Sequence, residues 1–192
     1  MAAGDMDHPL RPSAAPSRGR HRRTGEAGSA VSAWFLVLCA ASLAAADEPL
    51  RANPFNDPFE RATSGAAACP VPRGPAYSES QMRAEAHSRI ERGTTCWLSG
   101  LCSEPNAYRY DARVAQGVVA ALRGDAELDR AASIWVIVQR RIVYLQGCVA
   151  SPQQARRAEA IAAAVPEVER VIPSLSAPGE APLYPLQSDT AR

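Results

Sequence analysis

The most regular hydrophobic pattern in the chain lies between residues 133 and 149, where two apolar runs flank the polar triplet Gln139-Arg140-Arg141. Each run is rich in β-branched and aromatic residues and alternates along its length, which predicts a β-hairpin. Side chains of the first strand divide between two faces, with Ile134, Val136 and Val138 on one and Trp135 and Ile137 on the other. Those of the second strand divide likewise, with Val143, Leu145, Gly147 and Val149 opposite Ile142, Tyr144 and Cys148. Because both faces are apolar, we expect helices to cover one and an N-terminal segment, linked through Cys148, to cover the other.

Helical periodicity appears on both sides of this hairpin. Asp111 can cap a helix that is closed by Gly124, and its apolar positions follow one face. Ser151-Pro152-Gln153-Gln154 is a capping box that starts a second helix, which ends at Pro166 and precedes a short strand at residues 167–175. A right-handed crossover would make the last two strands parallel. Residues 111–175 are therefore predicted to form a small αββαβ domain of the α+β class, a three-stranded mixed sheet packed on two helices.

The chain before this domain divides into two parts. Residues 47–77 are proline-rich and predict an extended linker, whose doubled Pro-Phe pattern fits two turns or a peptide ligand. Residues 78–110 start with a capping box at Ser78 and predict a helix to Arg92, stopped by Gly93, with an apolar stripe along one face. A loop should follow, in which Cys96 and Cys102 enclose a buried Trp97. At the other end, residues 176–192 predict a flexible tail.

Residues 1–46 are typical of a signal peptide. An arginine-containing leader precedes an apolar run from Val31 to Leu43, and Ala44-Ala45-Ala46 offers a cleavage site. The apolar run is too short to span a bilayer. We therefore expect a soluble exported protein, periplasmic and possibly peripheral to the outer membrane or secreted, with no transmembrane span in the mature chain.

Four cysteines remain after such cleavage, since only Cys39 is removed with the leader. An even number of cysteines in an exported chain indicates two disulfides. Three pairings are possible and the sequence does not choose among them. We favour a local staple between Cys96 and Cys102 and a long bridge between Cys69 and Cys148.

Charge and composition narrow the function. The formal net charge is +1 and all 21 cationic side chains are arginine, which argues against a general nucleic-acid binder. His87 is the one histidine left after cleavage, and the sequence contains no phosphate-cradling glycine loop and no metal-ligand spacing. We expect no cofactor, no metal and no enzymatic activity.

The residues from Asp111 to Leu175 resemble a BON domain, a small α/β module of bacterial envelope proteins. The positions that carry the resemblance are the Asp-initiated helix ending Ala121-Leu122, the alternating strands from Ile134 to Val149, the Ser151-Pro152 helix start, Ala158, Ile161-Ala162, Val168 and Val171. Three positions depart from the family pattern: Arg140-Arg141 replace the turn glycine, Glu167 replaces a small residue, and Pro173 lies near the end of the last strand. The resemblance implies a non-catalytic module associated with phospholipid surfaces and with larger envelope assemblies.

These observations predict an exported envelope protein that docks on anionic phospholipid or on an envelope protein assembly. The arginines expected to make the contact are Arg109, Arg113, Arg123, Arg140 and Arg141. The alternative for them is a solvated basic face, because acidic residues interrupt the charge. Two other functions stay open. One is a structural or adaptor protein that binds a protein partner through the linker and the stapled loop, and the other is a thiol oxidoreductase that uses Cys96 and Cys102.

Overall fold

The computed structural model describes residues 48–177 and 179–187, so the predicted signal peptide at residues 1–46 lies outside the described residues. The elements in chain order are β1 (Arg51–Ala52), β2 (Phe59–Arg61), β3 (Ala76–Tyr77), α1 (Glu79–Glu91), α2 (Thr94–Leu98), η1 (Ala107–Tyr110), α3 (Asp111–Gly124), α4 (Ala126–Ala131), β4 (Ser133–Gln139), β5 (Ile142–Cys148), α5 (Pro152–Ala163) and β6 (Arg170–Ser176). Within the described part of the chain, no helix is long and apolar enough to cross a membrane.

The central sheet has the order β2-β4-β5-β6, and β1 pairs with β3 in a separate two-stranded sheet. β4 and β5 form the predicted antiparallel hairpin, and β5 pairs in parallel with β6 after the crossover through α5. The predicted α+β class and mixed sheet are confirmed. The predicted strand number is wrong, because β2 from the expected linker adds a fourth strand antiparallel to β4. This strand is only three residues long and follows Pro58, so no alternation could reveal it.

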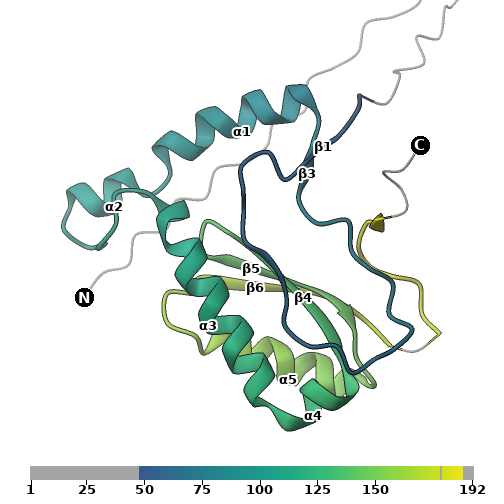
Figure 1. The fold of residues 1–192 in the computed structure, drawn as a ribbon. Coiled ribbons are helices and arrows are strands. Elements are labelled where there is room, and N and C mark those ends of the chain that lie inside the picture. Colours follow the sequence, from purple (N-terminus) through teal and green to yellow (C-terminus); the bar gives the residue numbers. More distant parts are fainter. Residues whose placement is uncertain (1–47, 178, 188–192) are drawn as a thin grey trace, which may run out of the picture. The chain divides into compact units, whose positions relative to one another are not determined.

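Helices α3 and α5 cover one face of the sheet, as Figure 1 shows. The side chains between the layers are fully buried and come from both strands of the hairpin and from α3, namely Val114, Val118, Leu122, Ile134, Val136, Val138, Val143 and Leu145. Helix α4 was not predicted from the sequence. It is a helix of six residues whose N-terminus is capped by the Asp125 side chain. It adds the buried Leu128 to the same core.

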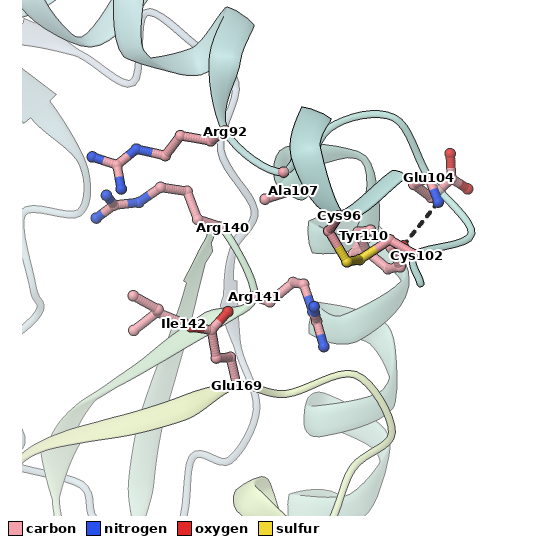
Figure 2. Close-up of a pocket in the computed structure, with 11 residues that line it drawn as sticks. Arg92, Cys96, Cys102, Glu104, Ala107, Tyr110, Arg140, Arg141, Ile142 and Glu169 are labelled. Carbon is pink, nitrogen blue, oxygen red and sulfur yellow. Dashed lines mark hydrogen bonds between the residues drawn. A yellow bond between two sulfur atoms is a disulfide. The ribbon is translucent and has the colours of Figure 1, made fainter. Parts of the chain in front are cut away.

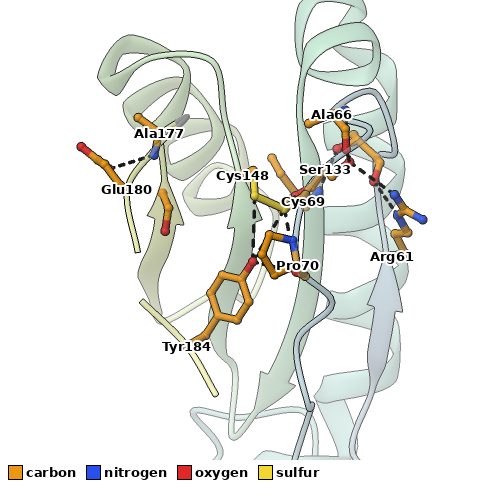
Figure 3. The surroundings of a disulfide bond; sticks show 12 residues. Arg61, Ala66, Cys69, Pro70, Ser133, Cys148, Ala177, Glu180 and Tyr184 are labelled. Carbon is orange, nitrogen blue, oxygen red and sulfur yellow. Dashed lines mark hydrogen bonds between the residues drawn. A yellow bond between two sulfur atoms is a disulfide. The ribbon is translucent and has the colours of Figure 1, made fainter. Parts of the chain in front are cut away.

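The other face of the sheet is covered by segments from both ends of the described chain. Cys69 and Cys148 form a disulfide that fixes the N-terminal segment over β5, in the pairing favoured above (Figure 3). Tyr184 is buried beside this disulfide and donates a hydrogen bond from its hydroxyl to the carbonyl oxygen of Pro70 at 2.8 Å. Described residues of the predicted tail, 176–192, therefore make specific contacts with the rest of the described chain. Ser176 belongs to β6, and a bridge between Pro72 and Leu186 holds the following segment.

The expected linker is also folded, and an ion pair holds it to α1. The buried carboxylate of Asp57 accepts two hydrogen bonds from the Arg89 guanidinium, each 2.7 Å long. This guanidinium lies between two aromatic rings, 4.0 Å from the Phe55 centroid and 4.1 Å from that of Tyr108. Phe55 thus packs within its own chain, which disfavours the peptide-ligand interpretation of the Pro-Phe pattern.

Helix α1 starts and stops where the sequence predicted. Ser78 forms the capping box with Gln81, and Gly93 has a left-handed φ of 90° just after the helix. The predicted apolar stripe is not buried, since α1 contains no buried residue and the Ile90 side chain is exposed. Instead of an apolar face, the side chain of Arg89 attaches this helix to the rest of the protein.

Candidate anion-binding site at the hairpin turn

The β4–β5 turn consists of two arginines in an unusual backbone conformation. Arg140 and Arg141 have φ values of 57° and 66°, which is the left-handed geometry of a two-residue hairpin loop. Asn-Gly is the common choice there, because most side chains disfavour positive φ. The buried carboxylate of Asp111 accepts a 2.8 Å hydrogen bond from each of the two arginine backbone N–H groups. This pair of bonds explains how the turn forms without glycine.

Asp111 therefore has a different role from the predicted one. It was expected to cap its helix, but the N-cap position of α3 is Tyr110 and no side-chain cap bond is present there. Burial raises the pKa of Asp111 to about 6, against the opposing effect of the two backbone N–H donors. At neutral pH the carboxylate is mostly ionised and holds the turn.

A pocket of about 380 Å³ opens between this turn, the end of α1 and the loop stapled by Cys96 and Cys102 (Figure 2). Three arginines line it: Arg92, Arg140 and Arg141. The carboxylates in its lining are those of Glu104 and Glu169. The pocket is thus more cationic than acidic before its ion pairs are considered.

The five arginines predicted from the sequence divide into three groups. Arg140 and Arg141 line the pocket. Arg109 and Arg113 lie beside it but are paired, Arg109 with Glu104 at 3.0 Å, and Arg113 with Glu104 at 3.6 Å and with Glu167 at 2.7 Å.

Arg123 lies elsewhere and is structural. Its guanidinium donates to the carbonyl oxygens of Arg61 and Ala62, both at 2.8 Å, and so fixes β2 against the end of α3. Arg123 does not line the pocket that contains Arg140 and Arg141.

Two of the charged side chains that line the pocket, Arg141 and Glu104, already have partners in the described chain. The Nε of Arg141 donates to the backbone carbonyl oxygen of Glu167 at 2.8 Å, and its guanidinium lies 5.1 Å from the centroid of the buried Tyr110 ring. Arg113 contacts the same ring at 4.9 Å. Glu104 is already occupied by Arg109 and Arg113, so it neutralises little of the remaining charge.

Arg92 and Arg140 remain as the available cations. Figure 2 shows their side chains extending side by side in the same direction, away from the staple. Among the residues that the structure describes, neither guanidinium has a hydrogen-bond or ion-pair partner. Two like charges that lie together without a counter-ion favour binding of an anion.

Sequence reasoning missed Arg92, because it is 48 positions away from Arg140 and belongs to no charge cluster. The available signal was its position at the predicted end of α1, directly before the stop residue Gly93. That signal gives a helix end but does not show where the end packs.

The fold described above places two helices on one face of a small mixed sheet built around a hairpin. The family model described as BON domain matches residues 110–178, and this segment is a BON domain. Asp111, Arg140 and Arg141 lie inside the match, whereas Arg92 and the stapled loop precede it. Comparisons with curated proteins and with solved structures gave no match.

Proposed function

We propose that this protein is a non-enzymatic component of the bacterial envelope that docks on anionic phospholipid through the arginines at its hairpin turn. The observation that carries the proposal is the pair Arg92 and Arg140, two guanidinium groups that lie beside one another at a pocket and have no hydrogen-bond or ion-pair partner among the described residues. Arg141 adds a third cation whose orientation is fixed by its bond to Glu167. The BON domain supports an association with the envelope or with phospholipid.

Phosphate is the anion that this arrangement fits best. Guanidinium groups bind phosphate oxygens through paired N–H donors, and such charge-assisted bonds are stronger than neutral ones. Each basic residue close to an anionic bilayer contributes about 1 kcal/mol, which corresponds to roughly fivefold in partitioning. Three arginines at one edge of the molecule could therefore give weak, reversible attachment to a lipid surface.

The cysteines support an oxidising compartment such as the periplasm. Both disulfides, Cys69–Cys148 and Cys96–Cys102, bridge segments outside or at the edge of the BON core. Disulfides that serve the fold in this way are typical of exported chains. The predicted signal peptide at residues 1–46 is consistent with the same location.

Vesicle flotation tests the proposal. The full chain should float with vesicles that contain phosphatidylglycerol, and the bound fraction should fall as salt is raised. The double variant Arg92→Gln/Arg140→Gln should partition about 25-fold more weakly, at about 1 kcal/mol for each charge.

The matched control is Arg130→Gln/Arg156→Gln. It removes two exposed arginines from α4 and α5 and leaves the pocket unchanged. Equal partitioning of the two double variants would show that the turn arginines have no special role. Failure of the unmodified protein to float would remove the lipid proposal altogether.

Glu169 gives a test of the opposite sign. This exposed carboxylate lines the pocket, and no arginine pairs with it among the described residues. Glu169→Gln should strengthen partitioning by a few-fold, because it removes a repulsion between the pocket and lipid phosphate. Unchanged or weaker partitioning would place the lipid contact away from this pocket.

A further inference from the structure

The stapled loop beside the anion pocket exposes large apolar side chains to solvent. Leu98 is 73% exposed, Leu101 is 82% exposed, and Trp97, which was predicted to be buried, is 45% exposed. Ile90 on the last turn of α1 adds another exposed apolar side chain nearby in sequence. Figure 1 shows that α2 and the loop after it project beyond the central sheet. Apolar side chains gathered in this way indicate an interaction site rather than a solvated surface.

The loop is also free of charge. Residues 93–103 contain no acidic or basic side chain, and the segment is bounded by Arg92 and Glu104. An added Cβ at Gly100 would find no atom within 4 Å, so the tip of the loop is not packed against another part of the described chain. The segment could therefore enter an apolar phase without burying an ionised group of its own.

Several backbone polar groups in the loop are already paired with one another. The N–H groups of Ser99, Gly100 and Leu101 donate to the carbonyl oxygens of Thr95, Trp97 and Cys96 at 3.1, 2.9 and 3.0 Å. The hydroxyl of Ser99 donates to the Cys96 carbonyl oxygen at 2.9 Å. This matters because an unpaired backbone group is costly wherever water is scarce, as in a bilayer. The Cys96–Cys102 disulfide keeps the arrangement ordered before any contact is made.

The arginines next to the loop favour an anionic surface as the binding partner of the loop. Cys96 and Cys102, which close the loop, line the same pocket as Arg92 and Arg140, so the loop and the available cations adjoin one pocket (Figure 2). A bilayer with anionic headgroups offers phosphates to the arginines and acyl chains to the leucines. Tryptophan is enriched at that boundary, since its ring is apolar and its indole N–H can stay hydrated.

We infer that residues 93–103 form an insertion loop that places Trp97, Leu98 and Leu101 in the interfacial region of an anionic bilayer, while Arg92 and Arg140 contact the headgroups. The inference rests on the proposed lipid docking and adds to it a part of the chain outside the BON domain. Apolar contact would supply attachment that persists at high salt, where the arginine contribution is screened.

Tryptophan fluorescence tests insertion directly. The full chain is mixed with phosphatidylcholine–phosphatidylglycerol vesicles whose acyl chains carry bromine, which quenches tryptophans that enter the bilayer. The difference between the unmodified protein and Trp97→Phe isolates the emission of Trp97 from that of Trp34 and of the buried Trp135. The emission of Trp97 should shift to shorter wavelength and be quenched.

Partitioning of a leucine variant gives the second readout. Leu98→Ser/Leu101→Ser should weaken vesicle binding about tenfold and abolish the part that resists salt. Both side chains are exposed, so the fold should not depend on them. Leu50→Ser/Leu183→Ser is the matched control, because it removes two other exposed leucines outside the loop.

The outcomes separate the two proposals. Quenching of Trp97 together with weaker binding of the loop variant supports insertion. If the protein binds vesicles through its arginines, but Trp97 is not quenched and the loop variant binds equally well, insertion is overturned and lipid docking stands. If the unmodified protein binds no vesicles, both proposals fail, and the exposed loop is then better explained as a surface for a protein partner.

Discussion

At the residue scale, the buried carboxylate of Asp111 couples the hairpin turn to pH. Its pKa is about 6 in the folded protein, raised by burial, whereas an aspartate in an unfolded chain titrates near about 3.9. Between these pH values the folded state binds more protons than the unfolded state. The contribution of this group to stability is therefore fully present below about pH 4 and is lost as the pH rises through about 6.

Asp111→Asn should remove this decline. The free energy of unfolding in urea, measured from about pH 4 to about pH 7, should then fall less steeply with pH than that of the unmodified protein. At neutral pH the variant should be less stable by about 1–3 kcal/mol, because the asparagine oxygen can serve only one of the two turn N–H groups well. Glu60→Gln, at an exposed carboxylate on β2, is the control. Parallel pH profiles for the unmodified protein and Asp111→Asn would contradict the account.

Arg89 attaches α1 to the segment that precedes β2. It is paired with the buried Asp57 and stacked between Phe55 and Tyr108. Arg89→Met should cost about 3–5 kcal/mol, because it leaves a buried carboxylate without a counter-ion. The double variant Asp57→Asn/Arg89→Met should recover part of this loss, since the charge itself is then absent.

A double-mutant cycle from urea unfolding measures that coupling. Additive losses for the two single variants would show that Asp57 and Arg89 contribute independently. The same pair also bears on the site, because Arg92 is three residues after Arg89 on the same helix end. Loss of the ion pair should therefore weaken vesicle binding as well as stability.

At the scale of elements, the hairpin depends on one glycine. Gly147 in β5 has φ of 140°, and a Cβ at this position would lie 2.0 Å from the carbonyl oxygen of Ser133 in β4. Gly147→Ala should therefore destabilise the protein by about 2 kcal/mol or more, through strain and separation of the strands. Gly124→Ala is the control, since nothing lies within 4 Å of its added Cβ, and it should change stability by no more than about 1 kcal/mol. Thermal unfolding of both variants checks the prediction, and equal midpoints would contradict it.

Four of the elements that the sequence predicted have a sustained period. α3, β4, β5 and α5 each repeat apolar positions at the spacing of their own geometry, so their type and order could be read directly. β2 has three residues and α4 has six, which is too short for a period to appear. The apolar stripe on α1 was expected to pack against the protein, but it does not. A charged side chain, Arg89, makes the contact that the apolar residues were expected to make.

The site was predictable only where it is local in sequence. Arg140 and Arg141 could be placed at a turn because the strands on either side were clear. Arg92 joins them only through the packing of α1, which depends on Asp57 and on a folded N-terminal segment that composition described as a linker. The cysteine spacing indicated a closed loop at residues 96–102 but not which side chains face outward, so Trp97 was assigned to the interior.

At the scale of the whole described chain, the two disulfides should differ in what they stabilise. The bridge between Cys69 and Cys148 spans 79 positions and that between Cys96 and Cys102 spans 6. On the chain-entropy account, loss of the long bridge costs about 4 kcal/mol and loss of the short one about 2 kcal/mol. The long bridge also holds Tyr184 and the segments that cover the second face of the sheet.

Cys69→Ala/Cys148→Ala should therefore release both ends of the described chain while the helical face stays folded. Hydrogen exchange should show lost protection at the backbone N–H groups of Arg73 and Gln187, which bond across these segments, and retained protection within α3. Cys96→Ala/Cys102→Ala should leave the same groups protected and loosen only the loop that bears Leu98 and Leu101. Because vesicle binding depends on that loop, the second variant should lose more affinity for anionic lipid than the first, although it loses less stability. If affinity instead follows stability across the two variants, the loop has no part in membrane contact beyond its contribution to the fold.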